Sequence, residues 1–459
     1  MTKEAAPCAF YDYGHQIDVP RCHENTRVAV LEKIGDWVDL IIEITALIMW
    51  LYGAAGAGKS AIARTMAEIL HDRRQLLATF FFSRQDSSRN HINSVIATLA
   101  YKIALIVPGA RPLIIATIEN DPLVFHSTFA HQLRQLILEP LHQLSQQGVV
   151  YPTVIVIDGL DECIDHDERT ILLHAISGAA GQDSTPLKFL ITSRPEVPIA
   201  RVFNTVPVID VSTRHSLGDE PESMEDVGYF LSAKFDEIRR THPLRRHIPY
   251  EWPPSWVMPD LMKKSSGQFI YPATIIRYIW SPRHNPTLRL DVVLRLRPLS
   301  GESPFAQLDA LYKYILLSCE NVELALRIIG MCLLNTQRMH APWTEDTYPF
   351  PSRTTIPTNM EGILSLNLGD VQCCLEDLGS LVKYKSDHIE LRVLHASLFD
   401  FLSDPIRFSG LPFSLAAIHT DLAIWCSYLG ARHGNVQIED LDCESDILYH
   451  LFLSWQRAP

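Results

Sequence analysis

The first half of the chain alternates between short apolar runs and stretches that are glycine-rich, acidic or otherwise polar. Residues 47–52 read LIMWLY, and residues 153–157 read TVIVI. Comparable runs occupy residues 76–83, 187–192 and 206–211. Runs of this length that are rich in β-branched and aromatic residues predict strands buried on both faces, as in a parallel sheet covered by helices.

Helical spacing of apolar residues fills most of the chain between these runs. The helix before the first run has apolar residues at Val28, Leu31, Ile34 and Val38. Asn25 or Thr26 is expected to cap this helix. A second helix is expected to start at Ser60 and to end near His71, and residues 91–147 are predicted to be mostly helical.

The pattern beyond Asp226 is helical almost throughout. Residues 281–305 are rich in proline, arginine and serine, which indicates a linker. A polar, proline-rich loop is expected at 340–357, and two short strands at 381–385 and 389–393. Helices followed by two short strands are typical of a small winged helix. No repeat array is visible in the sequence.

A glycine-rich motif lies where the first apolar run ends. Residues 53–60 read GAAGAGKS, which is the pattern G-x-x-x-x-G-K-[ST] between a predicted strand and a predicted helix. Glycines there let the backbone turn tightly and point N–H groups at phosphate oxygens. Lys59 is expected to reach the β- and γ-phosphates, and the Ser60 hydroxyl to bind Mg²⁺. The residues expected to contact the nucleotide are Gly53, Ala54, Ala55, Gly56, Ala57, Gly58, Lys59, Ser60 and Ala61. A chance match in a turn rich in glycine and alanine is the alternative.

An acidic cluster, DGLDE, follows the run at 153–157. Because ligands of open α/β sheets bind at the carboxyl ends of the strands, Asp158 is a candidate for orienting Mg²⁺ through water. Asp161 and Glu162 are candidates for positioning and deprotonating an attacking water molecule. An acidic turn that merely ends a strand is the competing interpretation.

Three more residues are assigned to the same site. Arg194 follows the run at 187–192 and is expected at the same edge of the sheet, where a guanidinium senses the γ-phosphate or stabilises the transition state. An ordinary surface arginine is the alternative. Thr26 and Arg27 are candidates for contacts at the adenine end, although their spacing alone favours a helix that only packs against the core.

Composition narrows the classes of function. With 459 residues the chain is long enough for about three domains, and 47% hydrophobic and 20% charged residues are typical of a globular protein. A net charge of -13 argues against a dedicated binder of nucleic acid or anionic membranes, so no nucleic-acid partner is expected. No signal peptide is visible, and the most apolar region, 38–52, is too short and polar to span a bilayer. The nine cysteines lack CxxC pairs and are expected to be mostly buried free thiols in the cytoplasm.

Several motifs together resemble a known family. The matching stretches extend from about residue 20 to about residue 405, and they are TRVAVLEKIGDWV, WLYGAAGAGKSAIA, FFFSR, VIVIDGLDEC, LKFLITSRPE, SGQFIYPATIIRYI and LHASLFDFLSDP. On these stretches the chain resembles a fungal NACHT-type P-loop NTPase of the STAND class, close to the nephrocystin-3-like N-terminal domain. Proteins of that class usually also carry an N-terminal effector module and a C-terminal repeat array, which are not recognised in this sequence.

The resemblance implies an architecture. The expected fold is α/β: a P-loop NTPase parallel sheet with flanking helices, followed by a helical domain and a winged-helix-like domain. The expected domains are a flexible tail (1–19), the NACHT nucleotide-binding domain (20–216), a helical domain with a linker (217–300), a winged-helix-like domain (301–403) and a C-terminal helical segment (404–459).

The resemblance also implies a signalling switch, like those of innate immunity or heterokaryon incompatibility. Such proteins are closed monomers with ADP bound; they open on exchange for ATP and Mg²⁺, oligomerise and bind protein partners. The family's winged-helix histidine, which touches the β-phosphate of ADP, corresponds to His395 in the stretch LHASL. On the residues alone, a single histidine on an apolar helix is more often a packed core residue. By the same resemblance Thr26 and Arg27 are adenine-side contacts, and Pro272 stands where alanine is more usual.

Three functions follow from these motifs and stay open. The first is an ATP-binding switch with weak ATPase activity, the second a non-catalytic scaffold that holds ADP, and the third a P-loop kinase of small molecules. A kinase needs a substrate lid and a second substrate pocket, which the helical C-terminal half does not indicate. A turnover assay separates the switch from the scaffold.

Overall fold

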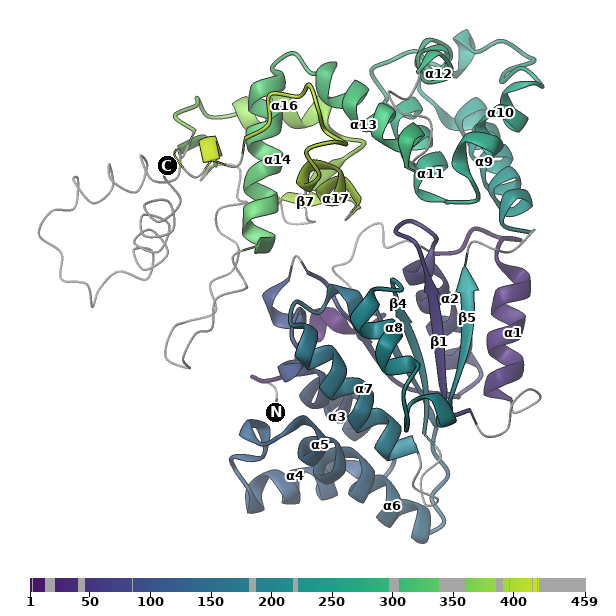
Figure 1. The fold of residues 1–459 in the computed structure, drawn as a ribbon. Coiled ribbons are helices and arrows are strands. Elements are labelled where there is room, and N and C mark those ends of the chain that lie inside the picture. The colour runs from purple at the N-terminus through teal and green to yellow at the C-terminus, as the bar shows by residue number, and fades with distance from the viewer. Residues whose placement is uncertain are drawn as a thin grey trace, which may run out of the picture. The chain divides into compact units, whose positions relative to one another are not determined.

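The computed structural model of the chain describes residues 1, 3–12, 21–39, 46–84, 86–180, 187–217, 222–296, 305–337, 360–362, 364–384, 391–395, 397–414, 416–418 and 420. The chain divides into two compact units (Figure 1). Unit 1 comprises Met1–Ala233 and Met258–Pro272, and unit 2 comprises Lys234–Val257 and Ala273–Pro459. Most of the expected C-terminal helical segment, the proline-rich loop at 340–357 and residues 13–19 of the expected tail lie outside the described residues.

Unit 1 is built on a five-stranded parallel sheet with the strand order β2-β3-β4-β1-β5. The strands are β1 (Ile48–Gly53), β2 (Leu76–Phe81), β3 (Val154–Asp158), β4 (Lys188–Ser193) and β5 (Ser212–Leu217). The predicted α/β fold with a parallel sheet is confirmed. Because all the strands run the same way, the stretches that follow their carboxyl ends meet at one edge of the sheet.

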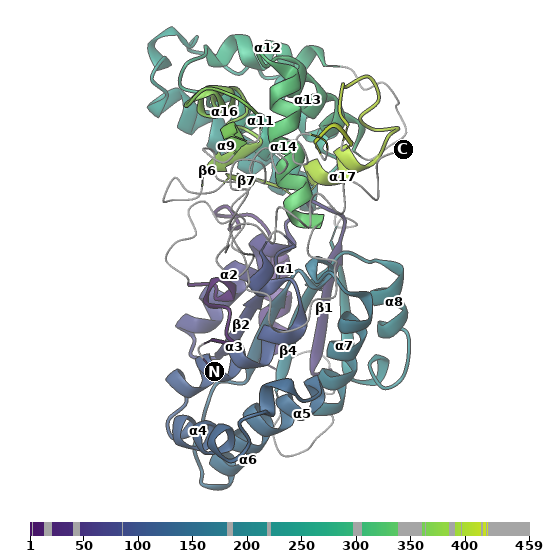
Figure 2. The same ribbon diagram turned by 90° about the vertical axis from the view of Figure 1, so that its left-hand side faces the viewer.

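Helices cover both faces of this sheet (Figures 1 and 2). On β1, Met49 and Leu51 pack in the cluster that contains α1 (Val28–Val38) and α2 (Lys59–Asp72). Ile48 and Trp50, which point to the other face, pack in a second cluster. The helices of that cluster are α3 (Val95–Ile106), α4 (Ala110–Asn120), α5 (Phe129–Leu133), α6 (Glu139–Gln146), α7 (His166–Ala180) and α8 (Val197–Phe203).

The prediction of a strand at 206–211 is wrong. Residues 209–211 form a short 3-10 helix, and the fifth strand is β5, directly after it. β5 reads STRHSL, and only its last residue, Leu217, is buried. Most of this edge strand is only partly buried, so it needs no apolar run, whereas the apolar Val206 and Ile209 are exposed.

The described part of unit 2 is mainly helical. Its elements are the end of α9 (Glu222–Thr241), most of α11 (Ile270–Ile279), α12 (Pro286–Arg295), α13 (Ala306–Leu317), α14 (Val322–Gln337), α16 (Asp370–Asp377), β6 (Val382–Tyr384), β7 (Leu391–Val393) and α17 (Ser397–Ser403). Helix α10 (Val257–Ser265) lies almost wholly in unit 1. The predicted pair of short strands is confirmed as an antiparallel pair, β6 with β7, with shorter strands than expected. Whether these elements form a winged helix stays a prediction.

The predicted linker at 281–305 is wrong in its centre, where α12 forms. The side chain of Asn285 caps this helix by accepting a hydrogen bond from the backbone N–H of Thr287 (2.9 Å), and Pro286 takes the first helical position. Leu290 and Val293 then bury one face of the helix. The proline and the cap residue, which suggest a loop in the sequence, are here a start signal for a helix.

None of the helices in the described ranges has the length and apolar character needed to cross a membrane. Among the described cysteines, all of which are free thiols, four are buried: Cys163, Cys319, Cys332 and Cys374.

Candidate nucleotide-binding site

The P-loop between β1 and α2 requires its glycines for steric reasons. Gly56 and Gly58 have φ angles of +79° and +93°, a region that side chains disfavour. A Cβ on Gly56 would lie 2.2 Å from Cγ2 of Ile270, and one on Gly53 would lie 2.7 Å from the carbonyl oxygen of Leu217. The motif therefore has the backbone conformation that a phosphate-binding loop needs. A chance turn rich in glycine and alanine would not require glycine at these positions.

Lys59 is the first residue of α2 and is buried. Its ammonium donates to the carbonyl oxygens of Gly53 (2.8 Å) and Ala54 (3.0 Å), inside the loop. Burial lowers the pKa of Lys59, the nearby Arg194 lowers it further, and the carboxylates of the acidic cluster oppose the shift. A desolvated ammonium of this kind gains strongly from an anionic ligand such as a phosphate.

Asp158 ends β3 and lies buried beside the P-loop helix. The hydroxyl of Thr192, at the end of the adjacent β4, donates to Asp158 Oδ1 (2.5 Å) and accepts from the backbone N–H of Gly159 (3.0 Å). Burial raises the pKa of Asp158, while hydrogen bonds with Thr192 and Ser60 and the charge of Lys59 oppose that rise.

The pair formed by the Ser60 hydroxyl and the Asp158 carboxylate fits a magnesium ion. The two groups hydrogen-bond with each other, so both oxygens face one point. Mg²⁺ prefers hard oxygen ligands and is usually held by one or two protein groups together with water and substrate phosphates. This fit agrees with the roles that the sequence predicts for Ser60 and Asp158, which stay predictions.

Asp161 is paired with Arg194. The backbone N–H of Arg194 donates to Asp161 Oδ1 (2.9 Å), and its Nε lies 3.1 Å from Oδ2. The main-chain carbonyl of Asp161 also accepts from the guanidinium groups of Arg84 and Arg169, each at 2.9 Å. These contacts fix the acidic turn and hold Arg194 at the sheet edge, so they favour a structural role for Asp161.

Glu162 is the better candidate for a general base. It is half-buried, and its Oε2 accepts a single backbone hydrogen bond, from Arg84 at 3.2 Å. Burial raises the pKa of Glu162, and the charges of Asp161 and Asp158 raise it further. A carboxylate with a raised pKa is a stronger base for a proton of water.

Three residues of this edge are missing from the sequence-based prediction. Thr192 and Arg84 follow or end apolar runs, so strand-end position alone is the signal that marks them. Arg169 comes from the first turn of α7, donates to the carbonyl oxygen of Cys163 (2.7 Å) and pairs with Glu196 (2.6 Å). No feature of the sequence distinguishes it from a surface arginine on a helix.

The structure changes the interpretation of Thr26 and Arg27. The predicted cap by Asn25 or Thr26 is wrong, because Arg27 is the N-cap of α1, in the left-handed region with φ of 58°, and no side chain caps the helix. The Thr26 hydroxyl donates to the carbonyl of His23 (2.7 Å).

The buried guanidinium of Arg27 bonds to the P-loop itself. It donates to the carbonyl oxygen of Ala57 (3.0 Å) and to the hydroxyl of Ser223 (2.8 Å), and it stacks 5.0 Å from the ring centre of Phe269. In a trans peptide the C=O and N–H groups point in opposite directions, so holding the Ala57 carbonyl also orients the N–H of Gly58. Arg27 thus positions the loop, and its contact with adenine stays a prediction.

His395 belongs to unit 2, where it lies between β7 and α17. It is half-buried, and its Nδ1 accepts a hydrogen bond from the backbone N–H of Ser397 (3.0 Å). It therefore has a specific polar setting rather than a wholly apolar one. Its contact with a nucleotide stays a prediction.

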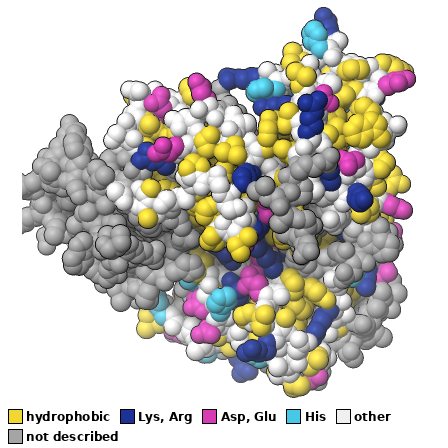
Figure 3. Space-filling model, turned by 45° about the horizontal axis from the view of Figure 1, so that its top comes forward, with side chains coloured by type: hydrophobic (Ala, Val, Ile, Leu, Met, Phe, Trp, Pro, Cys, Tyr) yellow, Lys and Arg dark blue, Asp and Glu magenta, His cyan; other side chains and the backbone are white. Residues whose placement is uncertain are grey.

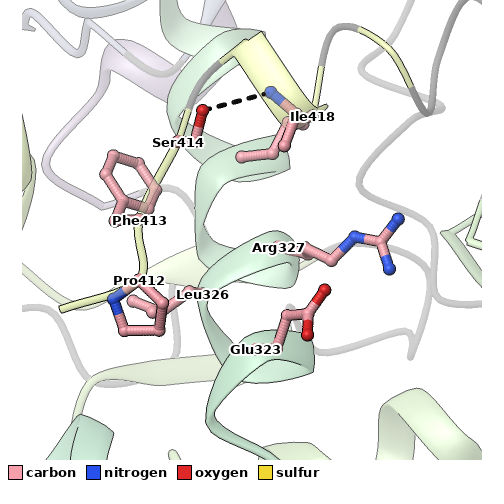
Figure 4. Close-up of a pocket in the computed structure, with 8 residues that line it drawn as sticks. Glu323, Leu326, Arg327, Pro412, Phe413, Ser414 and Ile418 are labelled. Carbon is pink, nitrogen blue, oxygen red and sulfur yellow. Dashed lines mark hydrogen bonds between the residues drawn. The ribbon is translucent and has the colours of Figure 1, made fainter.

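A cavity in unit 2 has a different character. It measures about 230 Å³ and lies between α14 and the residues 412–414, 417 and 418 (Figure 4). Its charged groups are Glu323 and Arg327 on α14, and its remaining lining is mostly apolar. Unlike the P-loop edge, the cavity has no glycine-rich loop or acidic cluster in its lining, so we do not assign it to the nucleotide.

The visible surface is mixed in charge. On the face shown in Figure 3, lysine and arginine side chains are scattered among acidic and hydrophobic ones.

Comparisons with known proteins place the resemblance in one part of the chain. Among curated proteins no sequence matches. Solved structures that match include the ORC2 protein of Aeropyrum pernix in ADPNP-ADP complexes, with TM-score 0.38, 12% identity, and 83% of this chain and 92% of that chain covered. Another is the ORC1 protein of the same organism in complex with DNA, with TM-score 0.33, 13% identity, and coverage of 88% and 95%. Drosophila ORC bound to DNA matches with TM-score 0.33, 12% identity, and coverage of 82% and 96%.

Residues 32–194 match the family described as nephrocystin 3, N-terminal, which confirms the resemblance expected from the sequence over that range. The matched range contains the P-loop, the acidic turn and Arg194, whereas Arg27 and His395 lie outside it. The part of the chain that is similar to this family is therefore the part that carries the candidate site, and its fold is that of a P-loop NTPase.

Proposed function

We propose that the chain is an ATP-binding switch of the NACHT type that hydrolyses ATP slowly. Whether ADP or ATP is bound determines the state of the switch. The observation that supports this most directly is the convergence of Lys59, Ser60 and Asp158, three chemically distinct groups, at one edge of the sheet. A phosphate-binding lysine beside a hydroxyl and a buried carboxylate suits a nucleoside triphosphate with Mg²⁺.

Each residue has a separate role in hydrolysis. Lys59 and the N–H groups of the P-loop bind the phosphates. Ser60 and Asp158 would hold the metal ion, which would supply positive charge to neutralise the phosphates. Glu162 accepts a proton from water as the water oxygen bonds to the γ-phosphorus and the bond to the ADP oxygen breaks. Arg194 stabilises the charge that develops on the transferred phosphoryl group.

The switch itself is inferred from the resemblance. We propose that His395 contacts the β-phosphate of ADP in a closed monomer, and that exchange for ATP releases this contact and allows assembly with further copies and protein partners. A ligand shifts such an equilibrium only by its difference in affinity for the two states, so ADP must bind the closed state more tightly than ATP does.

A scaffold that holds ADP without turnover is the second candidate. The observation in its favour is that both potential bases are engaged: Asp161 by Arg194, and Glu162 by the N–H of Arg84. For hydrolysis Glu162 must exchange that hydrogen bond for one to water.

Single-turnover hydrolysis of ATP distinguishes the two candidates. We expect slow turnover by the wild type and a loss of roughly 100-fold or more in Glu162→Gln, which keeps the shape of the side chain but removes the base. ATP affinity should change little. Glu32→Gln, at an exposed position on α1, is the matched control. Equal rates for Glu162→Gln and the wild type would exclude Glu162 as the base, and no turnover in either would favour the scaffold.

A further inference from the structure

Arg169, in the first turn of α7, holds the backbone on both sides of Glu162. Its Nη2 donates to the carbonyl oxygen of Asp161 (2.9 Å), and its Nε donates to that of Cys163 (2.7 Å). These two carbonyls belong to the residues immediately before and after Glu162. A planar guanidinium presents its N–H donors in a fixed arrangement, so the two hydrogen bonds constrain the turn together.

The other side of the guanidinium is anchored to α8. Its Nη1 lies 2.6 Å from Oε2 of Glu196, the N-cap residue of α8, and 3.1 Å from Nδ1 of His166. A guanidinium only donates, so both of these atoms accept. Helices α7 and α8 pack against each other (Figures 1 and 2), and Arg169 is 3% exposed. Four of its five N–H groups thus have protein acceptors, which fix the position of the side chain.

The hydrogen bonds around Arg169 fix the backbone of Glu162. In a trans peptide the C=O and N–H groups point in opposite directions, so the bond to the Asp161 carbonyl also orients the N–H of Glu162. That N–H donates to the carbonyl of Gly159 (2.7 Å), and the next N–H along the chain donates to the carbonyl of Leu160 (3.2 Å). The two peptide planes that meet at the Cα of Glu162 are therefore both held, and the freedom that remains is that of the side chain.

Such a backbone suits a base that must change its hydrogen-bond partner. The Glu162 carboxylate accepts a hydrogen bond from the backbone N–H of Arg84, which hydrolysis requires it to exchange for one to water. With the Cα held, rotation of the side chain alone makes this exchange, and the carboxylate keeps its distance from the reacting atoms.

We propose that Arg169 is a positioning residue: by holding the carbonyls of Asp161 and Cys163, it places the carboxylate of Glu162 for the attacking water. The inference rests on the proposed function, in which Glu162 is the base. The Asp161 carbonyl also accepts from Arg84, so loss of Arg169 removes one of two side-chain donors from that oxygen. The effect of losing Arg169 is therefore smaller than that of losing the base itself.

Single-turnover hydrolysis of ATP by the full-length protein tests whether Arg169 acts through Glu162. Arg169→Lys keeps the positive charge but lacks the fork that reaches both carbonyls and Glu196 together. We expect its rate to fall by about tenfold, because a displaced base is less effective, with ATP affinity little changed. In Glu162→Gln the same substitution should cost nothing further, because the base that it displaces is absent. Arg201→Lys, at an exposed position of α8, is the matched control.

Hydrogen exchange at single amides, measured by mass spectrometry, tests the hold on the turn without turnover. The amides of Glu162 and Cys163 should exchange about tenfold faster in Arg169→Lys than in the wild type, because the turn opens more readily. Glu196→Ala, which removes the anchor of Nη1, should change the rate and the exchange less, in the same direction. It carries both measurements if thermal melting shows that Arg169→Lys is unfolded.

The outcomes separate this inference from the proposed function. Wild-type exchange at these amides in Arg169→Lys, or a tenfold loss that persists in the Glu162→Gln background, would overturn the positioning role. If the exchange responds as expected but Glu162→Gln hydrolyses ATP at the wild-type rate, the proposed base is wrong. The hold of Arg169 on the turn then stands, and its part in hydrolysis is overturned together with the base.

Discussion

Buried charges of both signs lie at the carboxyl edge of the sheet. Burial lowers the pKa of Lys59 and raises the pKa of Asp158 and Glu162, so each group is held nearer to its neutral form than in water. The charges of Asp158 and Glu162 oppose the shift of the Lys59 pKa, and the charge of Lys59 opposes the shift of the Asp158 pKa. Such a cluster costs stability on its own, and binding of phosphate and metal charges offsets that cost.

The loss of stability that the buried charge of Asp158 causes should be visible in the pH dependence of unfolding. Because its pKa is raised in the folded protein, the folded state binds the proton more tightly than the unfolded chain does. The carboxyl therefore lowers stability as the pH rises from its unfolded pKa through its folded pKa. In the absence of nucleotide, Asp158→Asn should melt higher than the wild type at neutral pH, by about 2–4 °C for a gain of ~1 kcal/mol in a domain of this size.

Melting curves at mildly acidic and neutral pH check this prediction. The difference between Asp158→Asn and the wild type should shrink toward acid pH, where the wild-type carboxyl is protonated. Asp167→Asn, at an exposed position of α7, is the control for the removal of a surface carboxylate. A variant that is less stable than the wild type at every pH would mean that the ionised carboxylate stabilises the fold.

Among the site residues, the sequence predicts those whose type is dictated by phosphate or metal binding. Lys59, Ser60 and Asp158 stand in a motif or at the end of an apolar run, and the structure brings them together. Thr192 and Arg84 were not predicted, because their part depends on which strands are neighbours. Strand β4 lies beside β3 in the sheet although α7 separates them in the sequence, and that order is not visible in any local pattern.

Among the elements, the P-loop is constrained by packing as well as by its ligand. Gly56 lies against Ile270, the first residue of α11, and Arg27 at the start of α1 holds the carbonyl of Ala57. The loop conformation therefore depends on α1, which precedes β1, and on α11, which is far from the loop in the sequence. A substitution at Gly56 should disturb these contacts before any ligand is considered.

Gly56→Ala combines two defects that can be separated. The φ angle of +79° strains any side chain, and the new Cβ would lie 2.2 Å from Ile270. We expect a loss of stability of about 1–3 kcal/mol together with loss of nucleotide binding. Gly148→Ala, with φ of +77° and open space around it, measures the strain alone.

The double variant Gly56→Ala with Ile270→Ala then tests the clash. It should lose less stability than the sum of the losses in Gly56→Ala and Ile270→Ala, measured by denaturant unfolding, because Ile270 is buried and its truncation has a cost of its own. If Gly56→Ala and Gly148→Ala lose the same amount, and the losses of the two single variants simply add in the double variant, Ile270 does not press on the loop.

The elements that the sequence predicts are those with a full hydrophobic signature. β1 and β3 are buried on both faces and appear as continuous apolar runs, so their positions are confirmed within a residue or two. β5 has one neighbour and a polar sequence, and α12 begins with Asn285 and Pro286, which also occur in loops. Both depend on tertiary context, which a local pattern does not contain.

For the whole molecule, the chain passes repeatedly between its two units. It leaves unit 1 after Ala233, returns at Met258 and leaves again after Pro272. The domain boundaries predicted from the sequence treat these segments as consecutive, and they stay predictions. The last passage falls inside α11, whose Ile270 contacts the P-loop in unit 1 and whose Thr274 hydrogen-bonds with Tyr312 in unit 2.

The nucleotide content of the purified protein tests the central claim most directly. The full-length chain is denatured, and the released nucleotide is separated by anion exchange and quantified against protein. We expect close to one ADP per wild-type chain and almost none in Lys59→Ala, because the ammonium that binds the phosphates is gone. An absence of nucleotide from the wild type, or equal amounts in both proteins, would contradict the account of this edge of the sheet as a nucleotide-binding site.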